Sequence, residues 1–123
     1  MAKEKYLVIY PNHTVSWCEI ERSDMLHEFY KIIGCDSLEN VRSILPDICL
    51  IVDECGKIKD HPQLVNEVAS CFYAGAIMGN DLIVGPAILC SIGLVDGESD
   101  WIPLSERQLD VLRRLGLPIP EVV

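Results

Sequence analysis

Apolar and β-branched residues gather in short runs along the chain, and these runs predict strands. Tyr6–Tyr10 and Val15–Ile20 flank the turn cluster Pro11–His13, so together they predict a hairpin. Ile48–Val52 predicts a buried strand, and Ala87–Val95 predicts a long apolar one. The shorter predicted strands are Lys57–Lys59, Leu82–Val84 and Trp101–Ile102. Ser37–Leu45 fits either a strand or a short helix, because its periodicity does not separate the two.

Polar residues between these runs predict turns. Asp53–Gly56 predicts a turn that leads into an edge strand at Lys57–Lys59. Gly79–Asp81 predicts a second turn, and Asp96–Asp100 predicts a polar loop.

A helical spacing of apolar residues recurs in two segments near the two ends of the chain. After a predicted N-cap at Ser23, an apolar stripe runs toward Gly34, which predicts the helix end. The stripe consists of Leu26, Phe29, Tyr30 and Ile33. Ser105 and Gln108 predict a capping box, and Gly116 predicts the end of that helix. Its stripe consists of Leu109, Leu112 and Leu115.

A third helix is predicted between these two. Asp60–Gln63 predicts its start, since proline is tolerated in a first turn. Its predicted buried stripe consists of Val65, Val68, Ala69 and Phe72.

These elements predict the α+β class, because hairpins outnumber strict strand–helix–strand units. We expect an antiparallel-rich mixed sheet of about six strands, with about three helices packed mainly on one face. We expect residues 1–116 to form a single globular domain and residues 117–123 an extended, proline-containing tail on the surface.

The charge of the chain changes which partners we expect. Lys plus Arg is 10 and Asp plus Glu is 19, which gives a formal net charge of −9. Binding to phosphates needs the opposite sign, so we expect no direct nucleic-acid binding. An acidic mimic of a nucleic acid would need several carboxylates aligned on one face. The residues considered for such a face are Glu19, Glu21, Asp24 and Glu28.

The apolar runs are too short for a signal peptide or a membrane span, so we expect a cytoplasmic protein without membrane contact. The six cysteines include no C-x-x-C spacing, and most lie in apolar segments as core thiols. Cys55, in a predicted turn, is the thiol we expect to be most reactive.

Four segments of the sequence resemble the family known as domain of unknown function 3846. They are Asp53–Lys59, Leu64–Ala69, Ile77–Gly85 and Asp100–Leu109. The chain departs from the family pattern at Asp60–Leu64, where the family often has Gly-Leu-Pro before its Asn. The Gly-Pro-Ala after Val84 also extends the pattern. The resemblance implies an accessory protein of phages, mobile elements or Gram-positive bacteria, and it implies no known activity.

The search for reactive groups predicts no catalytic residues, no metal site and no cofactor. A thiol of Cys55 or Cys71 near His61 is conceivable, but core thiols explain these cysteines better. We expect a ligand, if one binds, to contact Asn66, Lys57, His61 and Trp101. For Asn66 we favour a structural alternative, in which its side chain holds the helix to the neighbouring Gly-Lys hairpin.

Three functions remain open at this point. The first is a non-enzymatic accessory protein that binds an unknown protein or small molecule, with host interaction or anti-defence as possible roles. The second is a small enzyme or binder acting on a nucleotide-like metabolite, and the third is the acidic nucleic-acid mimic. An exposed β edge or the proline-rich tail could also support a homodimer.

Overall fold

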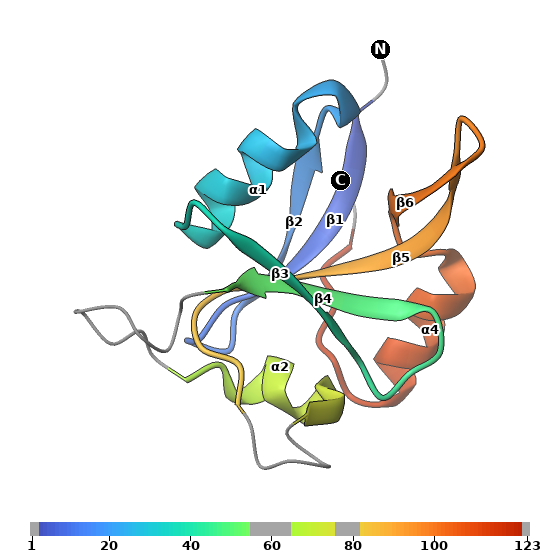
Figure 1. Cartoon of the computed structure of the whole chain (residues 1–123). Coiled ribbons are helices and arrows are strands. Elements are labelled where there is room, and N and C mark those ends of the chain that lie inside the picture. The colour runs from blue at the N-terminus through green and yellow to red at the C-terminus, as the bar shows by residue number, and fades with distance from the viewer. Residues whose placement is uncertain (1–2, 55–64, 76–81, 122–123) are drawn as a thin grey trace.

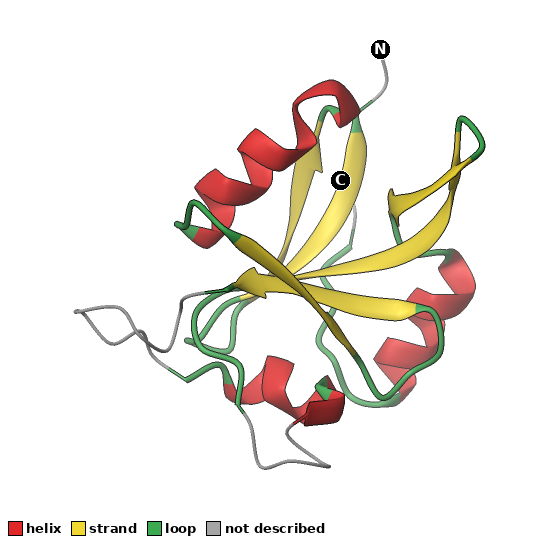
Figure 2. Cartoon of the chain, in the orientation of Figure 1, coloured by secondary structure: helices red, strands yellow, loops and turns green. Residues whose placement is uncertain are grey.

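The computed structural model describes residues 3–54, 65–75 and 82–121, and its strands and helices are shown in Figures 1 and 2. Its strands are β1 Glu4–Ile9, β2 Val15–Ile20, β3 Leu38–Arg42, β4 Ile48–Asp53, β5 Ala87–Val95 and β6 Glu98–Ile102. Its helices are the short 3-10 turn η1 Arg22–Asp24 and the α-helices α1 Met25–Ile33, α2 Glu67–Phe72 and α4 Glu106–Arg114.

The strands form one sheet in the order β2-β1-β5-β4-β3, and β6 also pairs with β5. Every pairing between these strands is antiparallel, so the predicted α+β class is confirmed, while no parallel pair occurs among the described strands. Ser91 pairs with β4 on one side and β6 on the other, and Leu89 pairs with β4 and β1. β1 and β6 therefore follow one another along the same edge of β5, and Figure 1 shows β1 and β6 diverging from each other.

The central strands are buried on both faces. Leu7, Leu50 and Leu89 face a core that α2 and α4 cover. Val8 and Ile88 face a second core that α1 covers. Two of the three described α-helices thus lie on one face and α1 on the other, as Figure 2 shows. Burial on both faces explains why these strands are continuous apolar runs without polar alternation.

Helix α1 begins later than predicted. Ser23 lies within η1, and Asp24 is the N-cap without a side-chain capping bond, so the predicted cap is wrong. The buried stripe is Met25, Phe29 and Ile33, whereas Leu26 is 53% exposed. Gly34 ends the helix with φ at 75°, as predicted.

Helix α2 begins at Glu67 with Asn66 as its N-cap, so the predicted helical run through residue 65 is wrong. Val65 instead forms an isolated β-bridge with Val84 and is exposed. This bridge is all that the described residues show of the predicted strand Leu82–Val84. The turn and edge strand predicted at residues 55–59, the helix start at 60–63 and the turn at 79–81 lie outside the described residues.

For two other segments, the structure decides between the predicted alternatives or corrects the predicted bounds. Leu38–Arg42 is a strand, because it pairs with β4. The predicted loop Asp96–Asp100 is shorter, since β6 already begins at Glu98. Asp96 and Gly97 have φ values of 53° and 82°, which is the two-residue turn that matches the twist of an antiparallel pair.

Helix α4 has the predicted capping box between Ser105 and Gln108. Its stripe buries Leu109 and Leu112, but Leu115 is 55% exposed, so this part of the prediction is wrong. Within residues 3–54, 65–75 and 82–121, none of the helices has the length and hydropathy that a membrane span requires.

The segment after α4 packs against the sheet. Leu117 is 4% exposed within the α4-side core, so the expected surface position is wrong for this residue. The indole Nε1 of Trp17 donates a hydrogen bond of 2.7 Å to the carbonyl oxygen of Pro120. The hydrogen bond from Trp17 fastens the segment to β2, and Leu117 anchors it in the core.

We predict that Leu117→Ala lowers the free energy of unfolding by about 2–4 kcal/mol, because it leaves a cavity in a packed core. The matched change Leu115→Ala, at an exposed position two residues earlier, should cost no more than about 0.5 kcal/mol. Urea unfolding followed by circular dichroism measures both. Equal losses for the two variants would mean that the tail does not pack as described.

Candidate functional site

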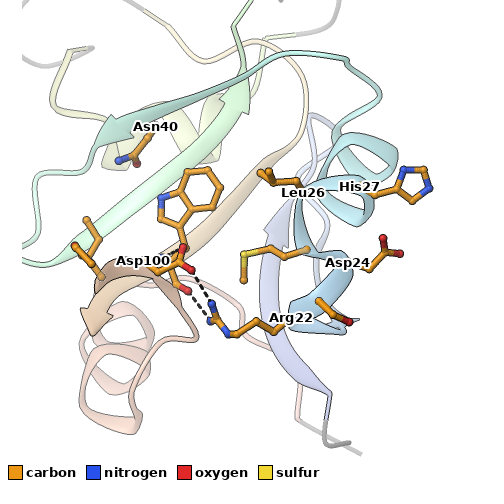
Figure 3. A pocket seen from close by; sticks show the side chains of 11 residues that line it. Arg22, Asp24, Leu26, His27, Asn40 and Asp100 are labelled. Atoms are coloured by element: carbon orange, nitrogen blue, oxygen red, sulfur yellow. Dashed lines mark hydrogen bonds and ion pairs between the residues drawn. The ribbon is translucent and has the colours of Figure 1, made fainter. Parts of the chain in front are cut away.

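A groove of about 770 Å³ lies between α1 and β6 (Figure 3). We call it the α1–β6 groove. It is lined by Arg22–His27, Asn40, Ile92 and Ser99–Trp101. Four elements besides η1 thus contribute to one concave surface, and Figure 3 shows Asn40 on the side opposite Leu26.

Trp101 forms an aromatic wall of the groove, and its ring packs on aromatic rings of the core. The ring of Trp101 lies 5.9 Å from that of Phe29, which in turn meets the ring of Tyr6 edge-on at 5.3 Å. Trp101 also pairs with Ile92 across the β5–β6 ladder, so the two side chains share a face of the sheet. Because the indole rests on buried rings, the groove has a preformed apolar surface.

Arg22 connects β1 and β6, the two strands that diverge beside the groove. Its Nε and Nη2 donate to the Glu4 carboxylate of β1 at 3.0 and 2.8 Å. Its Nη1 donates to the Asp100 carboxylate at 3.1 Å, and Nη2 also donates to the Trp101 carbonyl oxygen at 2.6 Å. All three guanidinium nitrogens are therefore engaged by β1 and β6.

These contacts set the electrostatics of the groove. The hydrogen bond with Glu4 is the main reason that the pKa of Arg22 is raised, so the guanidinium stays charged. Burial raises the pKa of Tyr6, whose hydroxyl donates to Glu4 at 2.8 Å. Asp24 is exposed and makes no capping bond. The guanidinium thus bonds two carboxylates, Glu4 and Asp100, and Asp24 adds a third carboxylate to the lining of the groove, which leaves this part of the surface negative.

Of the four predicted ligand contacts, the groove contains Trp101. Lys57 and His61 lie outside the described residues. Asn66 is fully buried on the opposite side of the sheet. The structure therefore does not bring Asn66 and Trp101 together.

The side chain of Asn66 is engaged by backbone groups. Its Nδ2 donates to the carbonyl oxygens of Ile9 and Gly85 at 2.8 and 2.9 Å. Its Oδ1 accepts from the backbone N–H of Ala69 at 3.1 Å, which caps α2. These bonds favour the structural alternative for Asn66, with Ile9 and Gly85 as its observed partners.

Sequence reasoning missed most of the groove. Asn40 and Asp100 carry no local signal of a site, and Arg22 stands out only once Glu4 and Asp100 are placed beside it. Asp24 belongs to the carboxylates considered for an acidic face, without a link to Trp101. Leu26 lies in a predicted helix stripe and Ile92 in a predicted apolar strand, and neither pattern indicates that these side chains are exposed.

The buried thiols are held in their protonated form. Burial raises the pKa of Cys18 and of Cys49 to about 11, and it raises the pKa of Cys90 well above its ordinary value. Cys71 is exposed, and Cys55 and His61 lie outside the described residues. In the part of the chain that the structure describes, no three His, Cys, Asp or Glu side chains gather as metal ligands.

Comparison with known proteins gives a family assignment. The family model described as Domain of unknown function (DUF3846) matches residues 4–116, which confirms the resemblance found in the sequence. No curated protein and no solved structure matches the chain.

We predict that Asn66→Ala lowers the free energy of unfolding by about 3 kcal/mol or more. It removes the amide hydrogens that the buried carbonyl groups of Ile9 and Gly85 accept, and it removes a helix cap. The matched change Asn40→Ala, at an exposed groove position, should stay within about 0.5 kcal/mol. Chemical denaturation distinguishes them, and a small effect of Asn66→Ala would show that its bonds are dispensable.

We also predict that alkaline pH destabilises the fold through its buried thiols. The folded pKa of Cys49 is raised above the ordinary 9.0, so the unfolded thiol ionises first as the pH rises. The stabilising contribution is complete below pH 9 and is lost toward about pH 11, at about 1.4 kcal/mol per pH unit for this thiol.

The measurement is the free energy of unfolding as a function of pH. Cys49→Ala should flatten the alkaline slope by this amount, whereas Cys71→Ala, at an exposed position, should leave the slope parallel to that of the wild type. Identical slopes for all three proteins would contradict the prediction.

Proposed function

We propose that this chain, which belongs to the DUF3846 family, is a non-enzymatic accessory protein that binds a protein or small-molecule partner in the α1–β6 groove. The observation that carries the proposal is the apolar surface that the groove leaves open. Leu26 is 53% exposed and Ile92 is 46% exposed, and both line the groove together with Trp101.

Three elements contribute these apolar side chains to one concave surface: α1, β5 and β6. Single exposed apolar residues are common, but several that converge in a groove with an aromatic wall are typical of a binding site. Tryptophan is also among the residues that contribute most to binding energy at interfaces. The packing of Trp101 on Phe29 holds its ring in place, which reduces the entropy lost on binding.

The polar groups of the groove favour binding over catalysis. The nitrogens of Arg22 already bond Glu4, Asp100 and a backbone carbonyl. Figure 3 shows His27 pointing away from Asn40 and Asp100, so these side chains do not converge on one reacting atom. They are placed to orient a partner at the rim.

The same arrangement disfavours a nucleotide-like ligand. A phosphate group is bound by cationic or N–H donors that are free to reach it. Among the described residues that line the groove, Arg22 is the permanent cation, and carboxylates occupy it. Any phosphate in the groove would also approach Asp24 and Asp100.

The thiols support a cytoplasmic location as part of the proposal. Cys49 and Cys90 lie opposite each other on adjacent strands, and both are free. Thiols in such positions stay reduced in the cytosol. Since the sequence resemblance implies phage and mobile-element proteins, we favour a host protein as the partner.

We predict that one exposed leucine in the groove matters for binding and a matched one outside it does not. Leu26→Gln should reduce recovery of the partner from a host extract by about tenfold or more, because it removes apolar contact area. Leu115→Gln, at a nearly equally exposed position on the α4 side, should leave recovery unchanged. Quantitative mass spectrometry of co-purified proteins and metabolites measures both.

Two results would contradict the proposed function. The first is an equal set of bound molecules for the wild type and Leu26→Gln. The second is turnover of a nucleotide or other metabolite by the purified wild-type protein.

A further inference from the structure

We infer that the partner presents a basic, extended segment that adds as a strand to the free edge of β5 at Ile92–Val95 and reaches into the α1–β6 groove. The inference rests on the proposed function and specifies the chemistry and the geometry of the partner.

Beyond Ser91, the edge of β5 that faces away from β6 has no strand beside it among the described strands, because β4 begins only at Ile48. The last pair of the β4–β5 ladder is Ile48 with Ser91. Before Ile48 the chain turns at Asp47, where φ is 61°. Beyond Ser91, β5 pairs only with β6 among the described strands. Figure 1 shows the β5–β6 hairpin projecting away from β4.

The backbone groups at this edge point outward. The Trp101 carbonyl oxygen accepts from Arg22 on the side of β6 away from β5. Trp101 and its partner Ile92 therefore form a pair without mutual backbone hydrogen bonds, and the alternation places Leu94 in the same position. The N–H and C=O groups of Ile92 and Leu94 thus face the side of β5 away from β6, where β4 begins only at Ile48.

The side chains beside this edge are apolar and open. Leu94 is 79% exposed, and Ile92 is 46% exposed and lines the groove. Both share a face with Trp101 through the β5–β6 register. A strand added at the edge would place alternate side chains over this face, next to the groove.

The charge around the edge selects a basic segment. The stretch Ile92–Ile102 contains Asp96, Glu98 and Asp100 and has no Lys or Arg. Asp24 adds a carboxylate within the groove. A second copy of this chain would bring two acidic hairpins together, so charge disfavours the homodimer at this edge. A strand with lysine or arginine side chains would instead be attracted, and one such side chain could lie against Trp101.

The test uses the full-length, ¹⁵N-labelled protein and two synthetic peptides of about eight residues, a length typical of a strand. One peptide alternates lysine with valine, and the other alternates glutamate with valine. Amide hydrogen exchange is followed at Ile92 and Leu94. Gly93 and Val95, whose amides face β6, are the internal reference.

We expect the lysine peptide to bind with a Kd below about 1 mM and the glutamate peptide to bind at least about tenfold more weakly. Binding should slow exchange at Ile92 and Leu94 by about tenfold or more and leave Gly93 and Val95 unchanged. Leu26→Lys should weaken binding of the lysine peptide by about tenfold, since it places a like charge in the groove. Leu115→Lys is the matched control and should bind like the wild type.

Each other outcome overturns a defined part of the inference. Equal or tighter binding of the glutamate peptide excludes the basic partner. Binding without protection of Ile92 and Leu94 excludes strand addition. Protection of both amides in the protein alone, with a doubled mass in light scattering, assigns the edge to a second copy. If neither peptide binds, the inference fails, and the extract comparison with Leu26→Gln separately decides the proposed function.

Discussion

The guanidinium of Arg22 holds the sheet together where it divides. β1 and β6 lie along the same edge of β5, so no ladder of backbone hydrogen bonds joins these two strands to each other. Arg22 supplies the connection, because it bonds the Glu4 carboxylate on one strand and the Asp100 carboxylate and Trp101 carbonyl on the other. Because the Trp101 carbonyl points away from β5 toward Arg22, the backbone groups of its partner Ile92 point away from β6. The groove, which Arg22 and Asp100 both line, therefore depends on this side chain.

The two-sided core explains why the groove is rigid and why it lies at the periphery. Leu7, Leu50 and Leu89 fill one face of the central strands, and Val8 and Ile88 fill the other. Polar chemistry is thus confined to the ends of the sheet. At one of these ends, Trp101 continues the row of rings that starts with Tyr6 and Phe29. The proposed partner would meet an aromatic surface that buried rings already fix, so its binding would need little ordering.

Much of the fold could be predicted from local patterns, and the errors have long-range causes. The apolar runs gave most strands, and Ser105 with Gln108 gave the start of α4. The stripe through Leu26 fits a helical period as well as the one through Met25, and both contain Phe29. The placement of the helix on the sheet decides between them, because it buries Met25 and exposes Leu26. Leu38–Arg42 is a strand because β4 offers it a partner. Asn66 caps α2 because Ile9 and Gly85, distant in sequence, take the hydrogens of its amide.

The candidate site was less predictable, because its electrostatics come from residues far apart in the sequence. Trp101 could be singled out as an aromatic residue, but nothing near Arg22 indicates that Glu4 and Asp100 neutralise it. The net charge of −9 predicts only that phosphate groups are not bound directly. In the structure, three of the carboxylates belong to the hairpin turn and β6, next to an edge whose own side chains are apolar. Like charges oppose pairing between two copies of such an edge, while they favour a strand of opposite charge. In the proposed strand addition, the acidity of this hairpin therefore selects a basic partner.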